Sequence, residues 1–269
     1  MNIQQEPEHT PPMQWWKKIL ILFLMVACIA SAAYHHKDVD TSAVAADTVS
    51  HKMPQAQEQT TPQKPEEKPE KPASPAPTVT DFSDVALLGN SYIDGFHIYN
   101  SLPGADCLYR VGLSVKTAFE KPMLGEQIPV IDKLLEKQYA YIFLTFGENE
   151  LGWQYPEIFI EDYRKLIETV KDRQPNAKLY IQSILPVSAE VSEKNEDNTN
   201  NERIREYNEL LRALAQEMQI FYLDVAAAMQ DAEGNLPTDA ATDGIHPGQA
   251  YNKKWADLIA QQVTEGAAK

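Results

Sequence analysis

A short run near the C-terminus holds an acid and an imidazole that could act together. In the run DGIH, Asp243 precedes His246 by three residues. A carboxylate at that spacing can hold the imidazole in the tautomer that a general base needs. Only two of the six histidines, His97 and His246, lie beyond residue 80. Since His97 would lie on the opposite side of its helix from Ser91, His246 is the candidate base.

Ser91 is the matching candidate nucleophile. It lies in the run GNSYIDG, between an apolar stretch and a segment with helical periodicity. A serine at a strand-to-helix junction exposes its hydroxyl, and the start of the helix supplies N–H groups for an oxyanion. An ordinary N-cap serine is the alternative. The run differs from the G-x-S-x-G elbow, because Ile93 replaces the second glycine.

A third polar run, GENE, occupies residues 147–150 after another apolar stretch. Asn149 could donate an amide N–H to a developing oxyanion, which contributes about 3–4 kcal/mol in a well-placed oxyanion hole. A turn asparagine is one alternative. Another is glycoside hydrolysis by a carboxylate pair, Glu148 and Glu150.

Strands and helices must bring these runs together. Apolar stretches of strand length alternate with amphipathic segments, which predicts a parallel sheet covered on both faces. We therefore expect an α/β fold, a three-layer α/β/α sandwich with about five parallel strands. In such sheets the site forms beyond the carboxyl ends of the strands. The expected strands are 85–88, 107–111, 141–146, 179–184 and 221–224, and the expected helices lie near 91–100, 128–137, 158–173, 202–219 and 249–265.

The three polar runs are, along the chain, GNSYIDG, GENE and DGIH. In this order and at these separations they resemble blocks I, III and V of the SGNH (GDSL-type) hydrolases. The resemblance covers residues 83–265. It implies a flavodoxin-like arrangement of the sandwich and the activity of a serine esterase or lipase. Carried over residue by residue, it makes Ser91 the nucleophile and completes a catalytic triad with Asp243 and His246.

The same resemblance implies an oxyanion hole. Its donors would be the backbone N–H of Ser91, the backbone N–H of Gly112 after the second strand, and the side chain of Asn149. Two positions depart from the family pattern: block I usually reads GDS and has Asn90 here, and block III usually ends in Asp and has Glu150 here. Asn90 keeps the size of aspartate without its charge, so we expect altered support of the turn and an intact nucleophile.

The N-terminal part differs in composition from the rest. All 11 glycines lie at residue 89 or later, whereas 10 of the 18 prolines lie in residues 1–80. Lys17 and Lys18 precede an apolar segment, which favours a cytoplasmic N-terminus. Cleavage of that segment and lipidation of Cys28 are alternatives to a retained anchor. The expected parts are a cytoplasmic segment 1–18, a signal anchor or signal peptide 19–34, a disordered Pro/Glu/Lys-rich stalk 35–80, and a hydrolase domain 81–269.

Charge and cysteine content limit the partners. The chain carries a formal net charge of −15, and residues 81–269 hold 30 acidic and 17 basic side chains, a net of −13. Nucleic acid is excluded as a partner, because phosphate binding needs a basic face. Anionic lipid headgroups would repel the domain, so membrane contact is expected through the N-terminal segment only. Cys107 is the single cysteine of that range, and we expect no metal and no cofactor.

These features favour an extracytoplasmic serine esterase, tethered at the cell surface or secreted, that cleaves acyl esters, acetyl esters above all, on carbohydrate. Trp153 and Tyr155, with Phe159, could form an aromatic wall for a sugar ring, or could pack the following helix. Two alternatives remain. One is a glycan O-acetyltransferase that uses the same triad, and the other is a non-catalytic, surface-displayed binding module.

Overall fold

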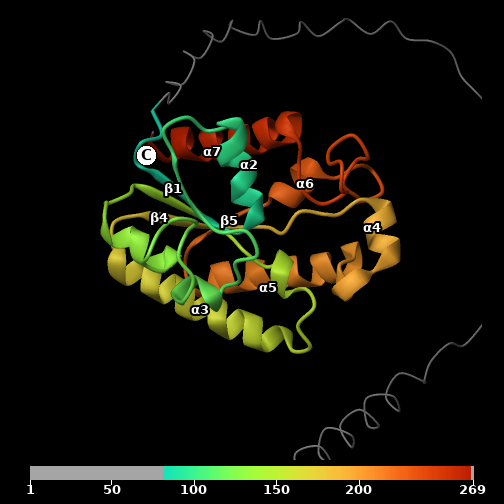
Figure 1. Cartoon of the computed structure of the whole chain (residues 1–269), viewed down its shortest axis with the longest axis horizontal. Coiled ribbons are helices and arrows are strands. Elements are labelled where there is room, and N and C mark those ends of the chain that lie inside the picture. The colour runs from blue at the N-terminus through green and yellow to red at the C-terminus, as the bar shows by residue number, and fades with distance from the viewer. Residues whose placement is uncertain (1–80, 268–269) are drawn as a thin grey trace, which may run out of the picture. The chain divides into compact units, whose positions relative to one another are not determined.

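A computed structural model describes residues 81–267, in which five strands form one parallel sheet of order β2-β1-β3-β4-β5. The expected segments 1–18, 19–34 and 35–80 lie outside the described residues. The strands are β1 (Val85–Gly89), β2 (Asp106–Tyr109), β3 (Tyr141–Thr145), β4 (Lys178–Gln182) and β5 (Phe221–Leu223). Helices flank the sheet, so the predicted α/β fold with five parallel strands is confirmed (Figure 1).

The helices cover the two faces of the sheet. They are α2 (Ser91–Tyr99), α3 (Pro156–Arg173), α4 (Ala189–Lys194), α5 (Asn201–Glu217), α6 (Val225–Met229) and α7 (Gln249–Ala267). Helices α2 and α7 lie on one face, and α3 and α5 lie on the other (Figure 1). Within residues 81–267, no helix combines the length and the apolar character needed to cross a bilayer.

Alternate residues of each strand enter different apolar layers, as the two-residue period of a strand requires. In β3, for example, Ile142 and Leu144 join the core on the α3 and α5 side, whereas Tyr141 and Phe143 join the core on the α2 and α7 side. All five residues of β3 are buried. The continuous apolar stretches thus reflect a sheet that is covered on both faces.

Two expected elements are shorter in the structure than the sequence predicts. The segment expected to be a helix near 128–137 forms only a short 3-10 helix, η2 (Val130–Leu135), after Pro129. Pro129 is extended, so the helix starts only at Val130 and holds six residues. Helical segments this short are often 3-10 helices, which are wound more tightly than α-helices. Strand β5 stops at Leu223 because Asp224 caps α6, accepting a hydrogen bond of 3.1 Å from the N–H of Ala227.

The strand order decides where a site can form. In the order 2-1-3-4-5 the chain moves to one side of β1 and then returns to the other, and ligands bind at such a switch point. Ser91 begins α2 almost directly after β1, and the 3-10 helix η3 (Glu148–Glu150) follows β3, the neighbour of β1. The runs GNSYIDG and GENE therefore meet at the carboxyl ends of two neighbouring strands.

Candidate active site

Ser91, His246 and Asp243 come together from opposite ends of the folded region. The hydroxyl oxygen of Ser91 lies 2.9 Å from His246 Nε2, and Asp243 Oδ2 lies 2.7 Å from His246 Nδ1. When Nδ1 carries a proton and donates it to Asp243, Nε2 can accept the proton of Ser91. This is the arrangement that activates a serine as a nucleophile.

Asp243 also shapes the turn on which it lies. Its Oδ1 accepts hydrogen bonds from the backbone N–H groups of Ile245, at 2.9 Å, and His246, at 2.8 Å. Partial burial raises the pKa of Asp243, but these bonds and the one from the imidazole outweigh it, so the pKa lies below its usual value. Gly244 has φ +76, and a Cβ there would collide with the hydroxyl of Ser188. The turn therefore needs glycine between the acid and the base.

The start of α2 fixes the serine. Asn90 is the N-cap residue, and its side chain accepts a hydrogen bond of 3.1 Å from the N–H of Tyr92. Since Asn90 performs the capping, Ser91 is not an ordinary N-cap serine. Asn90 is fully buried, and within residues 81–267 its side-chain amide nitrogen has no hydrogen-bond partner. Asparagine at this position thus supports the turn through its oxygen alone.

The three candidate oxyanion donors lie in loops beyond the strands. As the first residue of α2, Ser91 has a backbone N–H that no bond within the helix uses. Gly112 lies in an exposed turn after β2. Asn149, exposed in η3, donates one amide N–H to the carbonyl of Leu113 at 2.9 Å, which leaves its second N–H for a ligand. This bond joins the loop of Gly112 to the loop of Asn149.

Glu150 joins the same two loops from within the core. It is 0% exposed, and its two oxygens accept hydrogen bonds from the backbone N–H groups of Val115, at 2.7 Å, and Gly147, at 3.1 Å. Burial raises the pKa of Glu150 to about 7, although the two donors oppose the rise. Because both oxygens serve the backbone, Glu150 cannot work with Glu148 on a glycosidic bond. The interpretation as a glycosidase pair is wrong.

Glu148 lies at the active site instead. Ser91 can donate its hydroxyl to Oε2 of Glu148 at 3.4 Å, and Oε1 lies 3.7 Å from His246 Nε2. The side chain of Glu148 is 13% exposed. Burial raises its pKa, the positive charge of a protonated His246 and the hydroxyl of Ser91 oppose that rise, and the charge of Asp243 adds to it. The sequence alone did not distinguish the places of the two glutamates.

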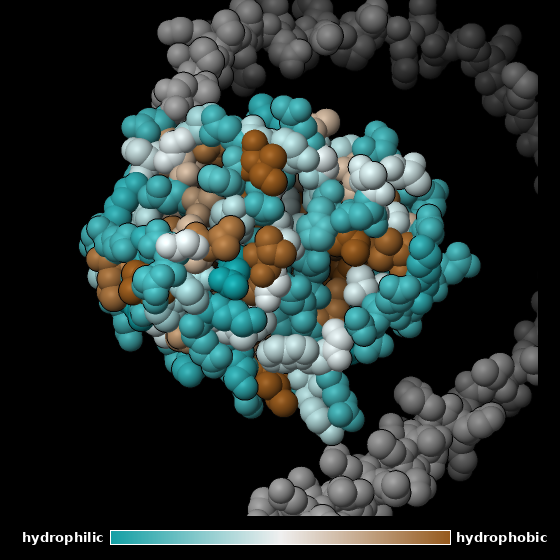
Figure 2. Space-filling model, viewed as in Figure 1, coloured by the Kyte–Doolittle hydropathy of each residue, from teal (hydrophilic) through white to brown (hydrophobic). Residues whose placement is uncertain are grey.

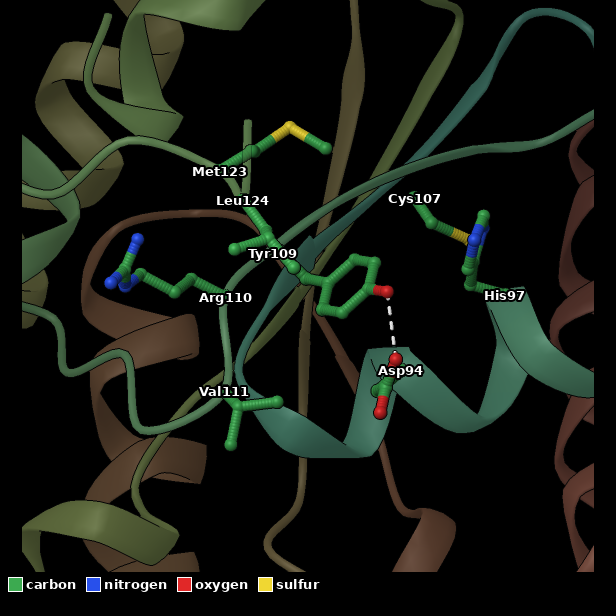
Figure 3. A pocket seen from close by; sticks show the side chains of 8 residues that line it. All are labelled: Asp94, His97, Cys107, Tyr109, Arg110, Val111, Met123 and Leu124. Atoms are coloured by element: carbon green, nitrogen blue, oxygen red, sulfur yellow. Dashed lines mark hydrogen bonds between the residues drawn. The ribbon is translucent and has the colours of Figure 1, made fainter. Parts of the chain in front are cut away.

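A cavity of about 500 Å³ lies between α2, β2 and the loop that follows β2, and Ser91 and His246 are not among the residues that line it. Asp94 lies one helical turn beyond Ser91, and the hydroxyl of Tyr109 donates to it at 2.7 Å (Figure 3). The full lining comprises Asp94, His97, Cys107, Tyr109, Arg110, Val111, Met123 and Leu124. The cavity was not predicted from the sequence. Asp94, which lies three residues after Ser91 and therefore on the same face of the helix, could have indicated a binding site there.

The other candidates from the sequence have different surroundings. Trp153 is half-buried against the core on the α3 side, whereas Tyr155 is 55% exposed at the start of α3. Phe159 is fully buried and stacks on Tyr207, so it cannot belong to a sugar-binding wall. His97 lines the cavity and does not contact the triad. Within residues 81–267, no cluster of three His, Cys, Asp or Glu side chains is arranged to hold a metal ion.

Comparison with known proteins agrees with this geometry. Residues 87–254 match the model of the GDSL-like lipase/acylhydrolase family. No curated protein sequence matches the chain.

Solved structures from bacteria share the fold. A GDSL-like lipase from Bacteroides thetaiotaomicron is 18% identical, with 72% of this chain and 93% of that chain covered and a TM-score of 0.53. A candidate acylhydrolase from Bacteroides fragilis is 17% identical, with 69% and 88% covered and a TM-score of 0.53. A protein from Streptococcus pneumonia, provisionally described as a platelet activating factor, is 19% identical, with 67% and 83% covered and a TM-score of 0.56.

Proposed function

The chain belongs to the GDSL-like lipase/acylhydrolase family, a family of ester hydrolases, and on that premise we propose that it is a serine esterase that removes acetyl groups from carbohydrate hydroxyls. The observation that carries the proposal is the hydrogen-bonded series Ser91, His246 and Asp243, with distances of 2.9 and 2.7 Å. A location outside the cytoplasm, tethered through residues 19–34, is part of the proposal and rests on the sequence of that segment.

In the proposed reaction, Ser91 Oγ attacks the ester carbonyl while His246 Nε2 takes its proton. The carbonyl electrons move to the oxygen, which the N–H groups of Ser91 and Gly112 and the amide of Asn149 would stabilise. When the tetrahedral intermediate collapses, His246 returns the proton to the departing alkoxide. The same imidazole then deprotonates a water that attacks the acyl-enzyme, which releases acetate and restores Ser91.

The cavity that Asp94 lines, one helical turn of α2 beyond Ser91, supports a sugar ester as the substrate. Its volume of about 500 Å³ is in the range of small-molecule sites, which combine apolar walls with a few polar groups. Met123 and Leu124 offer apolar surface, and Asp94 offers a carboxylate to substrate hydroxyls. Tyr155, exposed at the start of α3, is a further candidate contact for a longer glycan.

The surface supports the same choice over an anionic lipid. Residues 81–269 carry a net charge of −13, from 30 acidic and 17 basic side chains, which repels anionic headgroups. On the face shown in Figure 2, apolar side chains form separate patches among hydrophilic ones. A lipid-water interface would favour one broad apolar surface.

The test compares the full-length protein with its Ser91→Ala variant on three esters: 4-nitrophenyl acetate, an acetylated hexose and a long-chain acyl ester. We expect the wild-type protein to hydrolyse both acetates, and the variant to lose that activity while keeping its circular dichroism spectrum. An unchanged rate in the variant would exclude Ser91 as the nucleophile. A clear preference for the long chain would exclude the carbohydrate substrate. Product analysis with a glycan acceptor distinguishes hydrolysis from acetyl transfer.

A further inference from the structure

Glu148 has contacts that the triad and the oxyanion hole leave unexplained. Its two oxygens face the reacting pair, one 3.4 Å from Ser91 Oγ and the other 3.7 Å from His246 Nε2. A second carboxylate is not needed to orient the imidazole, because Asp243 already accepts the proton of Nδ1 at 2.7 Å. Glu148 therefore lies on the side of the imidazole where the substrate must arrive.

The proposed reaction determines which part of the substrate comes near Glu148. To receive its proton, the ester oxygen of the departing alcohol must come within about 3 Å of His246 Nε2. Oε1 of Glu148 lies 3.7 Å from the same nitrogen. A hydroxyl on the carbon next to the one that bears the ester oxygen can then come within hydrogen-bonding range of this carboxylate.

A carboxylate in this place lacks a positively charged partner. Of the described residues, no lysine or arginine forms an ion pair with Glu148. The titratable groups that shift the pKa of Glu148 are His246 and Asp243, and Asp243 adds negative charge. A buried carboxylate is stable only when donors satisfy its oxygens. Besides Ser91 and His246, which serve the reaction, a donor can come from the substrate.

We propose that Glu148 binds the alcohol half of the substrate by accepting a hydrogen bond from a hydroxyl next to the acylated oxygen. The enzyme then selects acetates of polyols, and in particular of sugars with a free neighbouring hydroxyl. An acetate without that hydroxyl gains nothing from this hydrogen bond. This inference rests on the proposed function, since it assigns a role in recognising the alcohol that the triad releases.

The experiment uses two monoacetates of one methyl hexoside, one with a free hydroxyl beside the acetate and one with that hydroxyl O-methylated. Hydrolysis of both, and of 4-nitrophenyl acetate, is measured with wild-type protein, Glu148→Ala and Glu148→Gln. Glu168→Gln, at an exposed position of α3, is the control for a change of charge. Thermal unfolding of each variant shows whether it is folded, and Glu148→Gln retains the shape of the side chain if alanine is not tolerated.

For the free-hydroxyl acetate we expect Glu148→Ala to lower kcat/KM by about 10- to 100-fold, mostly through KM, since a hydrogen bond to a charged group is lost. Glu148→Gln keeps an acceptor oxygen and should lose less. For the O-methylated acetate and 4-nitrophenyl acetate, we expect a loss at least fivefold smaller, because only the contacts of Glu148 with Ser91 and His246 are then removed. Equal losses on all three esters would overturn the inference, because Glu148 would then act on the triad, and so would no loss on any. If the wild-type protein hydrolyses none of the three, the proposed function fails and the inference fails with it.

Discussion

The two halves of the site are supported in opposite ways. The nucleophile half, residues 89–92, 112–115 and 147–151, rests on fully buried side chains: Asn90 caps the helix of Ser91, and Glu150 fastens two loops. The base half, residues 243–246, is an exposed turn in which the side chains of Asp243 and His246 are 53% and 41% exposed. Its side-chain hydrogen bonds lie within the turn itself, apart from the contact with Ser91. One backbone bond ties the turn to the rest of the fold: the N–H of Ser188 donates to the carbonyl of Gly244 at 2.8 Å.

The contrast predicts how substitutions in each half affect activity and stability. The carbonyl must meet the serine and the oxyanion donors in one geometry, and a rigid core provides such preorganisation. The imidazole has only to be held in one tautomer and one orientation, which a single local carboxylate can do. We therefore expect changes in the base half to affect activity without unfolding the protein, and changes in the nucleophile half to affect stability as well.

The largest effect is expected from Asp243→Asn in the base half. The amide cannot accept the proton of Nδ1 as the carboxylate does, so the imidazole loses the required tautomer. We expect kcat/KM for 4-nitrophenyl acetate to fall on the order of 1000-fold, with little change in the melting temperature because the turn is exposed. A loss of activity below tenfold, or a strongly lowered melting temperature, would contradict the division into two halves.

Glu150 in the nucleophile half should make stability depend on pH. Its folded pKa is raised from the usual 4.5 to about 7, so the folded state binds a proton that the unfolded state releases between these values. The free energy of unfolding should then fall as the pH rises from about 4.5 to 7, by about 3 kcal/mol relative to Glu150→Gln. Urea unfolding of both proteins at pH 5 and pH 8 measures this. Parallel pH curves for the two proteins would refute the assignment.

Gly147 tests how closely the nucleophile half is packed. It has φ +119, and a Cβ there would collide with the buried side chain of Ile184. We expect Gly147→Ala to lower the free energy of unfolding by about 2–3 kcal/mol. Gly125→Ala is the matched control, since Gly125 also has a positive φ but a Cβ there meets nothing within 4 Å, and it should cost only about 1 kcal/mol. Equal losses would show that the packing contributes nothing.

The smallest effect is expected from Tyr155→Ala, outside both halves. Because this side chain is 55% exposed, its removal should change the free energy of unfolding by less than about 0.5 kcal/mol. If Tyr155 contacts a longer glycan, KM for an acetylated oligosaccharide should rise about threefold while KM for the acetylated monosaccharide stays constant. Equal KM values for the variant and the wild type on both substrates would remove Tyr155 from the binding site.

The sequence predicted the sheet because its strands are buried on both faces and read as continuous apolar stretches. It also predicted where the polar runs meet, because the carboxyl ends of parallel strands share one edge. It could not separate Glu148 from Glu150, since two identical side chains two residues apart differ only in what the fold places around them. The cavity was missed because its walls include Met123 and Leu124, whose position depends on a loop with no periodic pattern.

Labelling with a serine-directed phosphonate tests the nucleophile most directly. Full-length protein is incubated with a 4-nitrophenyl phosphonate, digested, and analysed by mass spectrometry. We predict one label per chain, on the peptide that contains Ser91, with no label in Ser91→Ala and slower labelling in Asp243→Asn. Folded wild-type protein that stays unlabelled, or that carries the label on another residue, would contradict the assignment of Ser91 and favour a non-catalytic binding module.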